Sequence, residues 1–347
     1  MKTIVFAGGG TAGHIMPNIA LINELKYDFN CVYVGGDGME KDICLSRGIP
    51  FHRIDTVKFR RDKLLSNISV PFKLRACVKQ AKQVLSEIKP DLVFGKGGYA
   101  ALPVVLASSA PVLCHESDFS PGLTTKLTKK KAEKVLCAFS PCAVRFKNGL
   151  YVGTPLNQSL YRGVKDTRHY GLDGGKPIIA VVGGSSGAAS VNAKIIDMLP
   201  DLLKDYQIIH MTGKNKQGGE KRRGYATVEF ENDMARLYAT ADIIITRAGA
   251  NAIAECIALN KPTIAVPLEK ASRGDQLQNA EYYGKLGAIK VLRERELNGL
   301  SAAVKDVMDN KDKYATAMKN INIDGTKKIV SIINSVLYSG ASPGHAR

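Results

Sequence analysis

The chain has 347 residues, 45% hydrophobic and 23% charged, and its 49 lysines and arginines against 32 aspartates and glutamates give a formal net charge of +17. This composition excludes a disordered or collagen-like protein, and the length favours two domains. No apolar stretch reaches the roughly 20 residues that cross a bilayer, and the short apolar start passes directly into glycines, so we expect neither a membrane-spanning helix nor a secretory signal.

Short runs rich in β-branched residues alternate with helix-like stretches along the whole chain. In the first half they lie at 3–7, 31–35, 92–95, 111–116 and 134–139, and in the second half at 177–184, 206–213, 241–246, 262–268 and 288–293. Continuous apolar strands separated by helices are typical of parallel sheets that helices cover on both faces. The pattern therefore predicts a doubly wound α/β fold.

A near repeat indicates two Rossmann-like domains. The segments FAGGGTAG (6–13) and VVGGSSGA (181–188) both place a glycine turn after an apolar strand, and they lie half a chain apart. Between them, GTPLNQSLYRG (153–163) has the glycine, proline and polar residues of a linker and no strand or helix period. We expect domains at 1–158 and 159–326, a last helix at about 327–338 that returns to the first domain, and a mobile tail at 339–347.

Glycine-rich turns follow three of the predicted strands, at 8–13, 95–99 and 183–187. In an open parallel sheet, ligands bind beyond the carboxyl ends of the strands, where glycine lets the backbone approach and the next helix presents unpaired N–H groups to anions. The spacing is not the GxGxxG of a dinucleotide site, and GxxxxGK[ST] does not occur. The turns predict an anionic ligand, or close contact of a ligand with the backbone, in a cleft between the domains, and they disfavour a dehydrogenase or a P-loop enzyme.

Six segments, in order, give the chain its resemblance to a known family: GGGTAGHIMP, GKGGYAALP, HESDFSPGLT, GGSSGA with Asn192, TRAGANAIAE and DQLQNA. Over about residues 3–295 the chain resembles the bacterial MurG family of N-acetylglucosaminyltransferases. The resemblance implies the two-domain GT-B glycosyltransferase fold. It also implies inverting transfer of N-acetylglucosamine from UDP-N-acetylglucosamine to the 4-hydroxyl of undecaprenyl-pyrophosphoryl-MurNAc-pentapeptide, lipid I to lipid II in peptidoglycan synthesis, without a cofactor or metal.

The resemblance places the UDP-sugar in the second domain. Ser185 and the N–H groups of its turn suit the diphosphate, since a hydroxyl and a helix start both donate to anionic oxygens. Glu255, about one turn inside a helix, is placed on the ribose hydroxyls, and Gln276 and Asn279, on one helical face, are placed on the sugar. For each of these a structural role as a helix cap or a solvated side chain remains an alternative. Further donor residues implied are Thr11, Gly13, Asp118, Asn157, Ala250, Asn251 and Ala252.

The reaction needs a base for the acceptor hydroxyl and stabilisation of the leaving diphosphate. His14, at the end of the first glycine turn, is one candidate base, because an imidazole titrates near neutral pH. Glu116 and its neighbour His115 are the competing candidates, and the sequence does not rank them. Arg247 either adds a fixed charge or orients its loop. The acceptor-binding residues implied are Gly9, Gly10, Gly97, Gly98, Tyr99, His115 and Thr125.

At three positions the chain departs from the family pattern. Asp118 and Thr125 stand where asparagine is common, and Asn157 stands where an arginine is typical. The last change removes a charge that would face the nucleotide. These departures put details of donor binding in doubt and leave the fold untouched.

The positive charge implies an anionic partner. The segment 64–82, LLSNISVPFKLRACVKQAK, combines apolar and basic residues in a composition suited to an anionic lipid surface, although an ordinary core helix is the alternative. We expect a peripheral protein at the cytoplasmic face of the bacterial membrane. The seven cysteines are scattered without a CxxC pair, so we expect reduced packing residues and no zinc site.

Three other functions compete with this one. A different UDP-sugar enzyme of the same fold, either a glycolipid glycosyltransferase or an epimerase, would share the glycine turns. A nucleic-acid-binding protein would explain the charge, but the sequence contains no recognisable binding module and no tryptophan for stacking, so we expect no nucleic-acid partner. A non-catalytic UDP-sugar sensor is the third.

Overall fold

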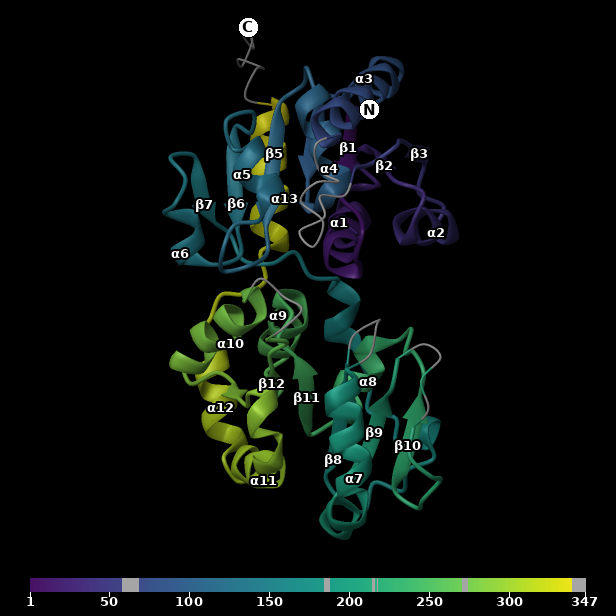
Figure 1. Cartoon of the computed structure of the whole chain (residues 1–347), viewed down its shortest axis with the longest axis vertical. Coiled ribbons are helices and arrows are strands. Elements are labelled where there is room, and N and C mark those ends of the chain that lie inside the picture. Colours follow the sequence, from purple (N-terminus) through teal and green to yellow (C-terminus); the bar gives the residue numbers. More distant parts are fainter. Residues whose placement is uncertain (58–68, 184–187, 214–215, 217, 270–273, 339–347) are drawn as a thin grey trace, which may run out of the picture. The chain divides into compact units, whose positions relative to one another are not determined.

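The computed structural model describes residues 1–57, 69–183, 188–213, 216, 218–269 and 274–338 (Figure 1). The chain forms two compact units, Met1–Asn157 together with the segment that begins at Asp324, and Gln158–Ile323. Each unit contains one parallel sheet between helices. Among the described residues, none of the helices has the length and apolar character needed to pass through a bilayer.

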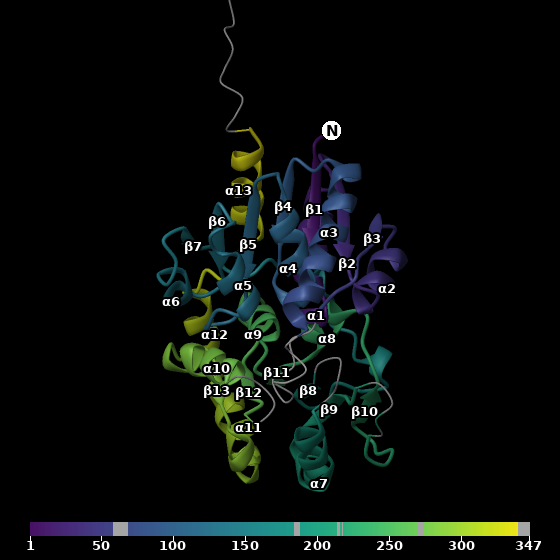
Figure 2. The ribbon, with the colours of Figure 1, turned by 45° about the horizontal axis from the view of Figure 1, so that its top comes forward.

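The sheet of the first unit has the strand order β3-β2-β1-β4-β5-β6-β7, and every neighbouring pair is parallel. Figure 2 shows these strands side by side, with β7 at one edge and β3 at the other. The order reverses between β1 and β4, which is where ligands bind in doubly wound sheets. The strands are β1 Thr3–Ala7, β2 Asn30–Gly35, β3 Phe51–Arg53, β4 Leu92–Gly95, β5 Val112–Glu116, β6 Lys134–Cys137 and β7 Gly149–Tyr151.

The helices of the first unit are α1 Ala12–Leu25, α2 Met39–Ser46, α3 Val70–Ile88, α4 Gly98–Ala107, α5 Leu123–Thr128, α6 Ser140–Ala143 and α13 Thr326–Tyr338. The last of these comes from the end of the chain and packs against α1. Its Ile329, Ile333 and Leu337 are buried in the same core as Ile22 and Phe29. The first unit is thus completed by a helix that follows the whole second unit in sequence.

The sheet of the second unit has the order β10-β9-β8-β11-β12-β13, again with parallel pairs throughout. β8 holds the position in this order that β1 holds in the other sheet. The strands are β8 Ile178–Val182, β9 Gln207–Met211, β10 Tyr225–Val228, β11 Ile243–Arg247, β12 Thr263–Val266 and β13 Lys290–Val291. The α-helices are α7 Ala189–Asp205, α8 Met234–Thr240, α9 Ala250–Ala258, α10 Asp275–Lys285, α11 Leu300–Asp309 and α12 Lys311–Lys319, and the 3₁₀ turns are η2 Gln158–Arg162, η3 Arg168–Tyr170 and η4 Glu294–Gly299.

The predicted doubly wound α/β class is confirmed, and each predicted run overlaps a strand. The pattern missed β3, β7 and β10, all of them sheet edges. An edge strand is half exposed and short, so it lacks the continuous apolar run that marked the others. The segment 153–163, expected to be a linker, includes the 3₁₀ turn η2, and its Thr154 pairs with Asp324.

Candidate functional site

The first glycine turn connects β1 to α1 and ends at His14, in the first turn of that helix. Gly10 has φ +88°, a conformation that favours glycine, and a Cβ there would stand 2.5 Å from the ring of Tyr99. The Thr11 hydroxyl lies 3.1 Å from His14 Nδ1. The Thr11 hydroxyl orients the imidazole, which is half-buried, and the exposed part of the ring can meet a ligand.

The second glycine turn, between β4 and α4, packs on the first. Gly97 and Gly98 have φ +79° and +72°. A Cβ at Gly98 would overlap the carbonyl oxygen of Gly9 and stand 3.2 Å from His14 Nδ1, and a Cβ at Gly97 would stand 3.5 Å from His14 Cδ2. The absence of side chains at these two positions lets the turns close around the imidazole.

A buried carboxylate lies behind the first turn. Glu40, in the first turn of α2, is 2% exposed, and its carboxylate accepts hydrogen bonds from the backbone N–H groups of Gly10, at 3.3 Å, and Gly36, at 3.1 Å. The sequence analysis did not identify this residue. The available signal was its place shortly after a strand and a second group of glycines, GGDG.

A buried lysine joins the second turn to the loop after β5. Lys96 is 1% exposed, and its Nζ donates to Ser117 Oγ. Burial lowers the pKa of Lys96 to about 8, although the nearby carboxylates of Glu116 and Asp118 oppose that shift. This residue was also missed, since a lysine inside GKGGY gives no sign of being buried.

The carboxylate of Glu116, a candidate base, already accepts hydrogen bonds from protein groups. It accepts from the N–H groups of Asp118 and Gly122, at 3.2 and 2.8 Å, and from the Thr125 hydroxyl, at 2.6 Å. Burial raises the pKa of Glu116, and these three donors oppose the rise. The side chain therefore organises the loop 117–122 and the start of α5.

His115 is buried as well, and its Nε2 lies 2.9 Å from the carbonyl oxygen of Gly153, to which it donates. Burial and the neighbouring Lys96 hold the pKa of this imidazole well below its ordinary value. A neutral ring tied to a backbone carbonyl fixes the end of β5. This arrangement leaves His14 as the candidate base that is partly exposed.

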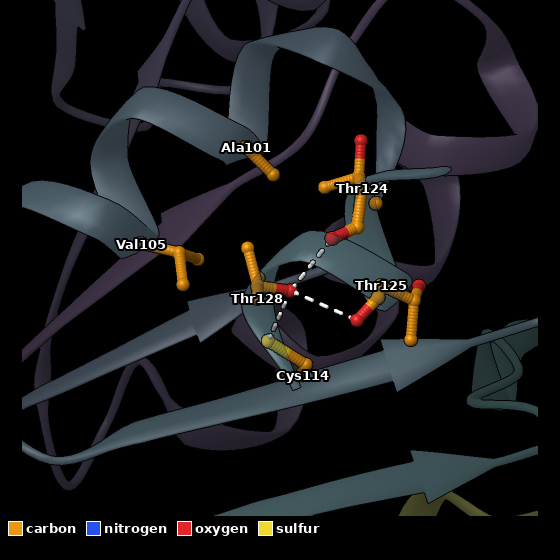
Figure 3. A pocket seen from close by; sticks show the side chains of 8 residues that line it. Ala101, Val105, Cys114, Thr124, Thr125 and Thr128 are labelled. Carbon is orange, nitrogen blue, oxygen red and sulfur yellow. Dashed lines mark hydrogen bonds between the residues drawn. The ribbon is translucent and has the colours of Figure 1, made fainter. Parts of the chain in front are cut away.

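The start of α5 contacts the second turn through a row of threonines. Thr124 Oγ1 donates to the carbonyl oxygen of Gly98 at 2.9 Å. Figure 3 shows Thr128, whose hydroxyl lies 2.9 Å from the Thr124 carbonyl oxygen, beside Ala101 and Val105 of α4 and above Cys114 of β5. The second turn is thereby supported from α4, α5 and β5 together.

In the second unit, the expected donor residues follow strands β8, β11 and β12. Ser185 lies outside the described residues. Glu255 on α9 is partly buried, and its Oε2 accepts from the Tyr238 hydroxyl at 2.8 Å. Burial raises the pKa of Glu255 to about 7. At the start of the same helix, Ala250 is buried while Asn251 and Ala252 are partly exposed.

The two amides expected on the sugar differ in their surroundings. Gln276, in the first turn of α10, accepts at Oε1 from the N–H of Leu268, at 2.9 Å, which ties the helix to the end of β12. Asn279 is completely buried. Of this pair, Gln276 is the residue with an accessible side chain.

Arg247, at the end of β11, is engaged by protein groups. Its guanidinium lies 2.7 Å from Glu294 Oε1, donates to Ser190 Oγ at 2.9 Å and lies within 3.4 Å of the Val266 carbonyl oxygen. This network joins the ends of β11 and β12 to the start of α7. It favours the loop-orienting alternative for Arg247.

The remaining donor residues, Thr11, Gly13, Asp118 and Asn157, lie in the first unit. Thr11 and Gly13 are exposed, and Asp118 and Asn157 are half-buried. Within the described ranges, no cluster of three or more His, Cys, Asp and Glu side chains is arranged to hold a metal ion.

Family models match both halves of the chain. Residues 4–137 match the glycosyltransferase family 28 N-terminal domain, and residues 178–333 match the glycosyltransferase family 28 C-terminal domain.

Curated relatives match nearly the whole chain. A UDP-N-acetylglucosamine–N-acetylmuramyl-(pentapeptide) pyrophosphoryl-undecaprenol N-acetylglucosamine transferase of Lachnoclostridium phytofermentans is 42% identical over 97% of this chain and 99% of its own. A protein of Bacillus cereus with the same description, numbered 2, is 38% identical over 97% and 99%.

Solved structures share the fold. MurG of Acinetobacter baumannii superposes with a TM-score of 0.75 at 24% identity, covering 96% of this chain and 100% of its own. A protein from Listeria monocytogenes described as a UDP-N-acetylglucosamine 2-epimerase gives a TM-score of 0.69 at 14% identity over 100% and 99%. At these identities the likeness shows the fold and does not separate transferase from epimerase.

Proposed function

The chain belongs to the UDP-N-acetylglucosamine–N-acetylmuramyl-(pentapeptide) pyrophosphoryl-undecaprenol N-acetylglucosamine transferases, and from this membership we propose how its residues share the reaction. The enzyme moves N-acetylglucosamine from UDP-N-acetylglucosamine to the 4-hydroxyl of the muramyl sugar in undecaprenyl-pyrophosphoryl-MurNAc-pentapeptide, converting lipid I to lipid II. The observation that carries this function is the 42% identity to a curated transferase along 97% of the chain.

His14 is the general base of this scheme. With its proton on Nδ1, donated to the Thr11 hydroxyl, the ring presents the Nε2 lone pair to the acceptor hydroxyl. As that proton is taken, the hydroxyl oxygen attacks the anomeric carbon from the face opposite to the UDP. The bond between this carbon and the UDP breaks, and the configuration of the anomeric carbon is inverted. A positioned base contributes about 10²- to 10⁴-fold in rate. Glu116 is the weaker candidate because three donors already hold its carboxylate.

The acceptor meets the turns that follow β1 and β4. Gly97 and Gly98 permit close approach of its diphosphate to the backbone, and the half-buried Tyr99 borders that surface. Gly9 is buried and the Gly10 amide donates to Glu40, so we assign these two glycines to the shape of the turn. His115 and Thr125 are buried, so we assign them to support of the acceptor surface. His115 fixes the end of β5, and Thr125 holds the Glu116 carboxylate.

The donor is held by the second unit. Glu255 accepts from the ribose hydroxyls while Tyr238 holds one of its oxygens, the backbone at Ala250, Asn251 and Ala252 meets the uracil, and Gln276 donates from its amide nitrogen to the sugar. Asn279, which is completely buried, supports α10. Ser185 remains our assignment for the diphosphate on the chemistry of its hydroxyl alone.

Helix α4 packs against both α3 and α5, and the exposed residues of α3 and α5 suit an anionic membrane surface. Phe72 on α3 is 72% exposed, and Leu123 and Leu127 on α5 are 44% and 52% exposed. Exposed lysines follow on the same short segment, namely Lys126, Lys129, Lys130 and Lys131. Each basic residue near anionic lipid contributes about 1 kcal/mol to binding.

We place the enzyme peripherally at the cytoplasmic face of the membrane. Anionic lipid as a partner accounts for the positive charge without nucleic acid. The residues Leu64, Leu65 and Ile68 of the expected interfacial segment lie outside the described residues.

Transfer of radiolabelled N-acetylglucosamine tests the function. Purified protein should label undecaprenyl-pyrophosphoryl-MurNAc-pentapeptide and leave diacylglycerol unlabelled. Labelling of diacylglycerol, or conversion of the UDP-sugar to its 2-epimer without any acceptor, would instead establish one of the competing enzymes. Binding of the UDP-sugar without turnover would establish the sensor.

A further inference from the structure

Glu40 of α2 places a buried carboxylate behind the first glycine turn, and the reaction scheme above does not use it. Only 2% of the residue is exposed, and its two carboxylate oxygens each accept a backbone N–H, Oε2 from Gly10 and Oε1 from Gly36. These amides belong to the segments that follow β1 and β2, respectively. One side chain therefore joins two neighbouring loops at the carboxyl end of the sheet.

The surroundings of this carboxylate are formed by glycines. A Cβ at Gly9 would overlap Glu40 Oε1, one at Gly36 would stand 3.2 Å from the same atom, and one at Gly38 would stand 3.1 Å from Oε2. An alanine at Gly9 would thus displace the carboxylate. The absence of side chains at these three glycines gives the carboxylate its space.

The contact continues from Glu40 to His14. Gly10, which donates to Glu40, lies under the Tyr99 ring, and its neighbour Gly9 lies against Gly98. Gly98 in turn packs on the His14 imidazole. A shift of the Gly10 amide would therefore move the turn that carries His14 and the turn that borders it.

We propose that Glu40 is a positioning residue for the transfer step: its carboxylate fixes the turn that carries His14, and its negative charge keeps the acceptor diphosphate away from the Gly10 amide. This inference rests on the proposed function, because it assigns His14 to the acceptor hydroxyl. A neutral acceptor such as glutamine could satisfy one of the two amides without the cost of burying a charge. A carboxylate can accept from both amides, and it also repels phosphate from the Gly10 amide, which would otherwise attract it.

A lower kcat together with a lower KM for the acceptor distinguishes this role from a merely structural one. In Glu40→Gln, kcat should fall about 10- to 100-fold, because a misplacement near 1 Å costs about 100-fold in rate. The KM for the lipid-linked acceptor should fall at the same time, since the diphosphate meets one negative charge fewer. The affinity for UDP-N-acetylglucosamine, measured by calorimetry, should not change.

Gly36→Ala is a second variant that keeps the carboxylate and both amides. Its methyl would stand 3.2 Å from Glu40 Oε1 and 3.2 Å from the Thr56 side chain. Displacement of the carboxylate by a few tenths of an ångström should lower kcat severalfold with the melting temperature nearly kept. Asp42→Asn, exposed on the same helix, is the matched control and should keep wild-type kinetics.

The proposal is overturned if Glu40→Gln keeps the wild-type kcat, or if its kcat falls while the acceptor KM stays unchanged or rises. Failure of the proposed function is a separate result, because then the wild-type protein itself would not label the lipid-linked acceptor.

Discussion

The imidazole of His14 packs directly on the backbone of Gly98, with only 3.2 Å between His14 Nδ1 and the place where a Cβ of Gly98 would stand. The candidate base is thus held by a turn without side chains, which leaves the acceptor room to approach. The same turn is held from below by the Thr124 hydroxyl.

Substitution Gly98→Ala should abolish most of the activity. The added methyl would overlap the Gly9 carbonyl oxygen, and the φ of +72° is strained for alanine, at a cost of about 1–3 kcal/mol in the free energy of unfolding. Gly171→Ala is the matched control, since Gly171 has φ +67° and no atom within 4 Å of its Cβ position. Thermal unfolding should show a loss in both variants, and lipid labelling should drop at least tenfold only in Gly98→Ala. Equal activities in the two variants would contradict the packing argument.

Removal of the imidazole in His14→Ala should lower kcat by about 10²- to 10⁴-fold, the usual contribution of a general base. UDP-N-acetylglucosamine affinity should stay near the wild-type value, because Glu255 and Gln276, which we place on the ribose and the sugar, lie in the other unit. His52→Ala, in the edge strand β3, serves as the control. Wild-type turnover in His14→Ala would eliminate this residue as the base and return attention to Glu116.

Glu255 should make donor binding depend on pH. Its pKa of about 7 means that the carboxylate, the form that accepts from both ribose hydroxyls, gains population as pH rises through neutrality. The affinity for UDP-N-acetylglucosamine, measured by calorimetry between pH 6 and 8, should rise with pH in the wild type. In Glu255→Gln it should be weaker and independent of pH. A parallel pH dependence in both proteins would remove the ribose assignment.

Lys96 should leave a signature in stability. Because its pKa is lowered to about 8 on folding, the unfolded chain holds more protons between pH 8 and the ordinary lysine value of 10.5. The contribution of Lys96 to the free energy of unfolding therefore rises with pH in that window, by up to about 1.4 kcal/mol per pH unit. Denaturant titrations should show that rise in the difference between wild type and Lys96→Met. A difference that is flat from pH 8 to 10 would mean that Lys96 keeps its ordinary pKa.

The apolar residues of α5 should contribute to membrane binding. Burying a leucine in an apolar environment gains about 1.5–3 kcal/mol, so Leu127→Ser should weaken cosedimentation with anionic vesicles about tenfold. Val164→Ser, at a residue 73% exposed in the second unit, is the control for loss of surface apolarity. If the two variants cosediment equally, another surface of the protein contacts the lipid.

The sequence was sufficient for features that repeat along the chain. Runs such as TIVFA mark central strands because both of their faces are buried, and the glycine turns mark the carboxyl edges of the sheets. Roles that depend on three-dimensional surroundings were not visible. Glu116 looked like a catalytic carboxylate until its three donors were located, and Glu40 and Lys96 looked like ordinary charged residues until their burial was known.

The helix α13 makes the first unit depend on residues that are translated after the whole second unit. Its Ile329, Ile333 and Leu337 fill a core whose other members are already present in the first 152 residues. During synthesis on the ribosome, domains generally fold in order from the N-terminus, but here the earlier unit must wait with an open apolar surface until the later one has been made. A stop codon shortly after Ile323 would therefore harm the half of the protein that was translated first.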